Sequence, residues 1–173
     1  MATTSAALGQ GESSEKVTLA SGSKKKRTTK AKKPLPTVKL PPNPFQSEIL
    51  DLINKTRGRQ KKVDLLQEYR NDALVSLLIW NFDDTVQSAL PDGDVPYKEN
   101  DAPAGTEHTS LRQEQRHFYN FIQGGNPGLS KTRRESIFIQ ILETLLPAEA
   151  EILCLVKDQR LVSKYPTLNQ EIV

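Results

Sequence analysis

Apolar residues from position 45 onward recur at intervals of three and four, and no segment shows a convincing strand pattern. This spacing places apolar side chains on one face of a helix. The first helix is predicted to be capped by Asn43, to open at Pro44 and to end near Gly58, with an apolar face of Phe45, Ile49, Leu52 and Ile53. A basic turn at residues 57–62 leads into a second helix whose inward residues are Val63, Leu66 and Tyr69.

Two further helices are predicted in the middle of the chain. One is capped by Asn71 or Asp72 and runs from Ala73 to about Trp80, with a buried stripe of Leu74, Leu77 and Leu78. The other runs from about Glu107 to Ile122 and stops at the glycine pair 124–125; Leu111, Phe118 and Ile122 share one face.

The C-terminal third predicts two more helices and a short tail. Leu129 and Ser130 open a helix that extends through Leu145, and Pro147 ends it and starts the next. In that next helix Ala150, Leu153 and Val156 face the core and Lys157 points outward; a short helical tail follows Pro166. The fold class is therefore all-α, a domain of about six short helices, with these residues buried: Trp80, Leu77, Phe118, Ile137, Ile141 and Leu153.

A long loop interrupts the helices at residues 91–105 and contains several Pro and Gly residues. Loops of this length are uncommon in compact domains and are often functional. The loop contains four acids whose spacing is not that of an EF-hand, so a solvated loop is the default interpretation: Asp92, Asp94, Glu99 and Asp101.

Charge divides the chain into two parts. Residues 1–44 have nine basic and two acidic residues, a net charge of +7, and no aromatic residue. The remainder has 15 basic and 19 acidic residues, a net charge of −4. Residues 1–42 are therefore predicted to be a disordered basic arm ending in a proline-rich spacer, because such a segment buries too little apolar surface to fold. Residues 43–173 form the predicted helical domain.

Two basic clusters are candidate binding sites. The arm cluster is typical of a non-specific nucleic-acid contact or a nuclear-localisation run, and a solubilising tail is the alternative: Lys24, Lys25, Lys26, Arg27, Lys30, Lys32 and Lys33. Lys131, Arg133 and Arg134 open a helix, where the helix dipole disfavours cations. They indicate an anion or an acidic partner, with a solvated helix face as the alternative, and Arg112 and Arg116 would extend the same surface.

Catalytic and cofactor motifs are not evident. Glu114 and His117 have a metal-ligand spacing but no second copy, and Cys154 lies in an apolar run typical of a buried, unreactive thiol. We therefore predict a non-enzyme with no cofactor and no metal. The single cysteine and the lack of a signal sequence or of an apolar run of about 20 residues favour a soluble intracellular protein without membrane contact.

Four ordered motifs resemble a small uncharacterised protein family of T4-like tailed phages, especially those of cyanobacteria. The motifs are residues 102–109, 121–127, 131–135 and 146–158. The family has no known function, so the resemblance implies no site residues. It implies a phage-encoded protein in the cytoplasm of a bacterial host, which weakens the nuclear interpretation of the arm.

The function that these features predict is that of an adaptor or accessory protein. The helical domain would bind a phage or host protein, and the arm would bind nucleic acid in transcription, replication or packaging. The alternative is a virion component whose arm threads into a neighbouring subunit or packaged DNA.

Overall fold

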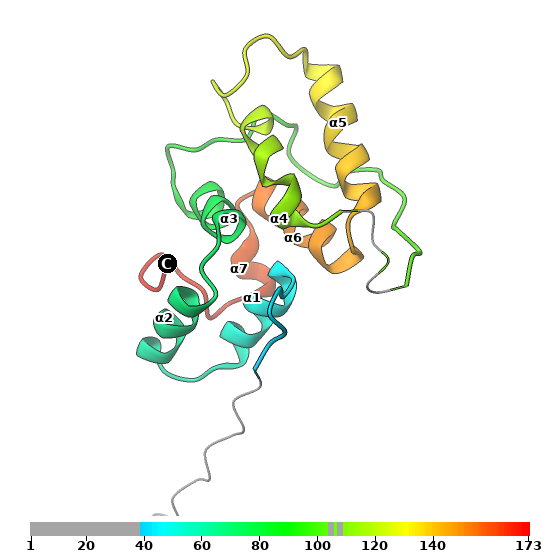
Figure 1. Ribbon diagram of the computed structural model, residues 1–173. Coiled ribbons are helices and arrows are strands. Elements are labelled where there is room, and N and C mark those ends of the chain that lie inside the picture. The colour runs from blue at the N-terminus through cyan, green and yellow to red at the C-terminus, as the bar shows by residue number, and fades with distance from the viewer. Residues whose placement is uncertain (1–38, 104–105, 107–108) are drawn as a thin grey trace, which may run out of the picture. The chain divides into compact units, whose positions relative to one another are not determined.

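The computed structural model describes residues 39–103, 106 and 109–173. These residues form seven α-helices and one 3-10 helix (Figure 1). They contain no β-strand beyond an isolated antiparallel bridge between Ser88 and Ile122. The predicted all-α fold is confirmed. The described helices are all too short or too polar to cross a membrane. Residues 1–38 of the predicted arm lie outside the described residues.

The first two helices, α1 (Gln46–Lys55) and α2 (Arg59–Glu68), form a helical hairpin closed by a turn at residues 56–58. The predicted start of α1 at Pro44 is wrong by two residues. Phe45 is the N-cap, and its N–H donates a hydrogen bond to Glu48 Oε2 at 3.0 Å. Asn43 instead accepts a hydrogen bond from Arg112 Nη1 at 3.0 Å, so this predicted cap residue connects to a distant helix.

The predicted end of α1 near Gly58 is also wrong, because the helix ends at Lys55. Gly58 is instead the N-cap of α2, with a φ of 100° that glycine adopts without steric cost. The predicted inward residues of α2 are only half-buried: Val63, Leu66 and Tyr69. The helix therefore lies at the edge of the domain.

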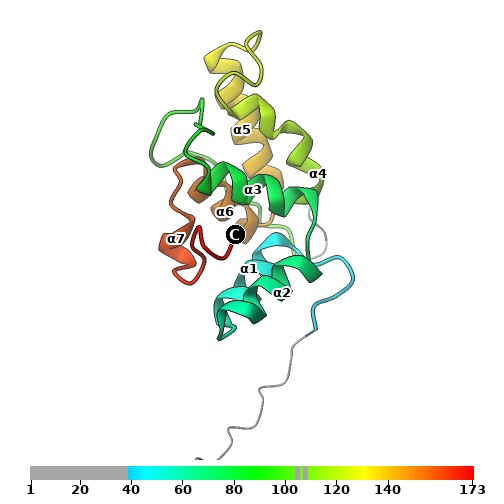
Figure 2. The ribbon, with the colours of Figure 1, turned by 90° about the vertical axis from the view of Figure 1, so that its left-hand side faces the viewer.

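Helix α3 (Asp72–Phe82) packs against α6 (Pro147–Lys157), and Figure 2 shows α3 crossing the middle of the view. Asn71 is the cap, since its Oδ1 accepts the Leu74 N–H at 2.9 Å. The predicted stripe is confirmed, because Leu74, Leu77 and Leu78 are buried. Trp80 is also buried and belongs to the same hydrophobic core as these leucines.

The predicted helix from Glu107 to Ile122 is not one continuous α-helix. A single α-helical turn, α4 (Leu111–Glu114), is followed by the 3-10 helix η1 (Gln115–Phe121); residues 107 and 108 lie outside the described residues. A 3-10 helix has three residues per turn, so Phe118 and Phe121 fall in one row. Both are buried, with ring centroids 5.8 and 6.3 Å from that of Trp80. Phe121 also meets Phe138 edge-on at 5.1 Å.

Helices α5 (Lys131–Thr144) and α6 complete the core and agree with the predicted bounds within a residue or two. Ser130 is the N-cap of α5 and Pro147 is the first residue of α6. Ile141 and Leu153 are buried as predicted, whereas Ile137 is only partly buried. The predicted tail helix is misplaced: α7 (Leu161–Lys164) ends before Pro166, and only turns follow it.

Glu149 joins three helix starts, a role that no local sequence pattern predicts. Its carboxylate is fully buried in the first turn of α6. Oε1 accepts the N–H of Gln46 at 2.8 Å, and Oε2 accepts the N–H of Leu111 at 2.9 Å. These are the first residues of α1 and α4, where N–H groups lack partners within the helix. One side chain therefore caps two helices from a third.

Candidate functional site

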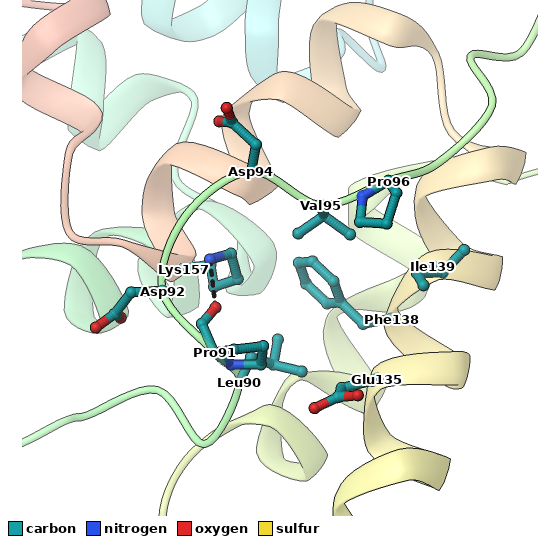
Figure 3. Close-up of a pocket in the computed structure, with 10 residues that line it drawn as sticks. All are labelled: Leu90, Pro91, Asp92, Asp94, Val95, Pro96, Glu135, Phe138, Ile139 and Lys157. Carbon is teal, nitrogen blue, oxygen red and sulfur yellow. Dashed lines mark hydrogen bonds between the residues drawn. The ribbon is translucent and has the colours of Figure 1, made fainter.

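A pocket lies where the acidic loop passes over α5 and α6 (Figure 3), and it encloses about 160 Å³. Its apolar wall combines loop residues with the side of α5: Leu90, Val95, Pro96, Phe138 and Ile139. Three acids also contribute to its lining, Asp92, Asp94 and Glu135. In Figure 3 the carboxylates of Asp92 and Asp94 point away from the cavity, so the charge lies at the rim.

Lys157 fixes the first part of this loop. Its Nζ donates hydrogen bonds to the carbonyl oxygens of Pro91 at 2.8 Å and Gly93 at 3.0 Å, and it also pairs with Asp158. Lys157 is only 2% exposed, so the prediction that it points outward is wrong. A buried ammonium group is tolerated where several acceptors replace its water, and the loop carbonyls and Asp158 supply them.

The single cysteine of the chain is not activated as a nucleophile. Cys154 lies on the neighbouring face of α6 and is half-buried. Burial raises the pKa of its thiol to about 11; Asp94 and Asp158 add to the rise and Lys157 opposes it. The thiol is therefore protonated at neutral pH, and a protonated thiol is a poor nucleophile. An apolar cavity with an acidic rim can accept an apolar side chain flanked by cations.

The predicted basic cluster at the start of α5 divides into two kinds of residue. Arg134 donates from Nε to Asn120 O at 2.6 Å and from Nη2 to Asn126 O at 3.0 Å and Leu129 O at 3.3 Å. Its guanidinium thus holds the turn before α5 closed. Lys131 and Arg133 are exposed and remain candidates for binding an anion.

The other predicted site residues are dispersed. The seven basic residues of the arm cluster, Lys24 to Lys33, lie outside the described residues, as does His108. His117 Nε2 lies 4.0 Å from Glu114 Oε2. Thr109 Oγ1 donates a hydrogen bond to Glu114 Oε1 at 2.6 Å. Within the described residues, no group of three or more His, Cys, Asp or Glu side chains is arranged to hold a metal ion.

Fold and site together define a small all-helical domain with an acid-rimmed apolar pocket. A family model described as "Family of unknown function (DUF6433)" matches residues 49–163, and the chain belongs to this family. Comparison with curated proteins and with solved structures gives no match. The predicted membership of an uncharacterised family is confirmed; the phage origin stays a prediction.

Proposed function

We propose that the protein is a non-enzymatic phage accessory protein whose arm binds nucleic acid and whose helical domain binds a protein partner. The observation that carries the proposal is the separation of charge along the chain. The first 44 residues have a net charge of +7, and the remaining residues have a net charge of −4. The resemblance of four sequence motifs to those of T4-like phage proteins supports the proposed phage origin.

The arm supplies attraction to phosphate without reading sequence. Its cluster places seven cations within ten residues, Lys24 to Lys33, and contains no acid. Lysine and arginine that neutralise phosphates release condensed counterions, which makes the affinity depend on salt and little on sequence. Transcription, replication and genome packaging all bring a phage protein to such a polyanion.

The acid-rimmed pocket is the proposed contact for the protein partner. Its apolar wall takes one apolar side chain, and the carboxylates of Asp92, Asp94 and Glu135 complement basic residues beside it. The partner segment is therefore basic, with an apolar residue between its cations. The anchoring of Pro91 and Gly93 by Lys157 holds this surface in shape before the partner arrives.

A salt titration tests the arm. Fluorescence anisotropy of a labelled duplex, at three or more salt concentrations, compares the full chain with a deletion of residues 1–33. A third protein keeps the arm but replaces its seven cluster cations by Gln, which separates charge from chain length. Each neutralised duplex phosphate adds about 0.9 to the slope of log affinity against log salt, so seven contacts contribute about 6.

We expect both altered proteins to lose most of this slope and to bind DNA and RNA weakly, while their thermal unfolding matches that of the full chain. Equal affinities for all three proteins would contradict the proposal and reduce the arm to a solubilising tail. The alternative, a virion component, predicts the same salt dependence and is distinguished by where the protein is found.

A further inference from the structure

The helical hairpin carries a basic surface that is separate from both predicted clusters. Five of the eight residues from 55 to 62 are basic and none is acidic, although the domain that contains them has more acids than bases. Lys62 is buried, and its Nζ donates to Thr167 O at 3.3 Å. The other four are exposed at the turn between α1 and α2, and we name them the hairpin patch: Lys55, Arg57, Arg59 and Lys61.

The positive charges of the hairpin patch are only partly neutralised by neighbouring acids. Lys55 Nζ lies 3.7 Å from Asp51 Oδ2, with both side chains more than half exposed. Arg59 Nη1 lies 3.9 Å from Glu171 Oε2. Arg59 Nη2 donates a hydrogen bond to the carbonyl oxygen of Glu171 at 2.8 Å. Arg57 and Lys61 make no side-chain ion pair or hydrogen bond with another described residue. Exposed ion pairs contribute about 0–1 kcal/mol, so these cations can turn to an external anion at little cost.

The position of these charges does not stabilise the helix that they begin. The first turn of α2 contains no acid, and Arg59 and Lys61 stand where the helix dipole favours negative charge. Gly58 provides no side-chain cap, and the space around its Cα is open to an approaching group. An anion bound by the hairpin patch would remove this unfavourable clustering of positive charge.

Only a short stretch of chain separates the arm cluster from the helical domain. In Figures 1 and 2 the first described residues, from 39 onward, leave the domain on the same lower side as the α1–α2 turn. Lys33, the last residue of the arm cluster, is six residues before Lys39 and therefore no more than about 20 Å of extended chain away. Two sites joined by a short linker engage one polyanion with a high effective concentration.

We propose that the hairpin patch is a second contact for the phosphate backbone of the nucleic acid that the arm binds. This inference rests on the proposed function, because it assumes that the arm binds nucleic acid and adds a second contact on the helical domain. The arm captures the polyanion, and Arg57 and Lys61 hold the same strand against the domain.

The test uses the full chain and a labelled 30-base-pair duplex. The hairpin variant, Arg57→Gln with Lys61→Gln, removes one exposed arginine and one exposed lysine. The matched control, Arg160→Gln with Lys98→Gln, removes the same two residue types from exposed positions elsewhere in the domain. We expect the hairpin variant to lower the slope of log affinity against log salt by about 2 and to weaken binding ~10-fold or more at about 0.1 M salt. The control should keep the wild-type slope.

Two further measurements keep the outcomes distinct. Hydrogen exchange on the wild-type protein should show added protection at residues 55–61 when the duplex binds, without any substitution. Combining the hairpin variant with the Gln-substituted arm should lower affinity below that of either alone. If the hairpin variant behaves as the control does and exchange is unchanged, the inference is wrong while the proposed function stands. If the full chain binds no duplex at all, both are wrong.

Discussion

Among the charged side chains that the described structure buries, Glu149 and Lys157 bind backbone groups of more than one segment. Glu149 accepts N–H groups from the starts of α1 and α4, and Lys157 donates to carbonyl oxygens of the acidic loop. Each charge joins segments that are far apart in sequence. Removing the Glu149 carboxylate would take the acceptor from N–H groups of two buried residues, and that penalty exceeds the net value of the hydrogen bond itself.

Glu149→Gln tests this view with almost no change in volume. Glutamine has one oxygen acceptor, so its NH₂ group would face one of the two N–H donors, from Gln46 or Leu111. We expect a loss of about 1.5–3 kcal/mol in the free energy of unfolding, measured with urea. The exposed Glu68→Gln, at the end of α2, should stay within about 0.5 kcal/mol of wild type. Equal stability of the two variants would mean that Glu149 is not an essential cap.

At the scale of elements, α3 and α5 both pack against α6 in the core. Leu77 is fully buried and Ile141 is 7% exposed, so truncating either leaves a cavity among close-packed neighbours. We expect Leu77→Ala and Ile141→Ala each to cost about 2–5 kcal/mol in chemical denaturation. Ile79→Ala, on the exposed side of α3 with 48% of its surface accessible, is the control and should cost much less. Losses below about 0.5 kcal/mol at both buried sites would contradict the assignment of helix faces.

The helices that the sequence predicts best are those in which local signals agree with packing. Helix α3 has a capping Asn71 and a regular stripe of leucines, and both predictions hold. The segment before Gly124 is different, because 3-10 and α-helices have nearly the same sequence pattern. Tertiary contacts decide it: Ala89 N–H donates to Phe121 O at 2.7 Å, and Gln123 N–H donates to Gln87 O at 2.9 Å.

Gly125 shows why this segment needs glycine. A Cβ atom there would lie 1.9 Å from the carbonyl oxygen of Tyr119, so a larger residue would force the backbone apart. The sequence predicts the glycine pair 124–125 only as a helix stop. Close approach of two backbones is not visible in a linear pattern, which is why the 3-10 geometry was missed.

The candidate site was predictable only in part. The length and composition of the acidic loop mark it as unusual in the sequence, but the pocket requires α5 and α6 beside it, and no local pattern reveals that arrangement. Lys157 was the signal that could have been used, since it continues the buried series Ala150 and Leu153 at helical spacing. Its charge led to the wrong orientation, because burial of a lysine depends on acceptors that the loop supplies from 64 and 66 residues away.

At the scale of the whole molecule, the two proposed binding surfaces lie at different ends of the helical domain. Helix α5, which forms part of the pocket, lies in the upper half of both ribbon views, and the α1–α2 hairpin lies in the lower half. Nucleic acid bound at the hairpin patch would leave the pocket free for a protein. Acidic residues around the pocket would repel phosphate there, which favours the hairpin patch as the contact for the nucleic acid.

Affinity purification from phage-infected cells tests this arrangement. Tagged full chain is compared with Asp92→Lys plus Asp94→Lys at the pocket rim, and with Asp64→Lys plus Glu68→Lys on α2 as the matched control, since all four acids are exposed. We expect a protein partner to remain on the wild type and the control after nuclease treatment. The pocket variant should lose ~10-fold or more of it, because reversed charge repels a basic segment.

The same infection distinguishes the accessory protein from the virion alternative. An accessory protein of transcription, replication or packaging is expected in infected-cell extracts and not in purified particles, so quantitative mass spectrometry of both fractions is the measurement. Retention in particles at a fixed copy number per virion would favour the structural alternative. Loss of the wild-type partner on nuclease treatment would show that nucleic acid bridges the two proteins, which would leave the arm and the hairpin patch, and not the pocket, as the surfaces that act.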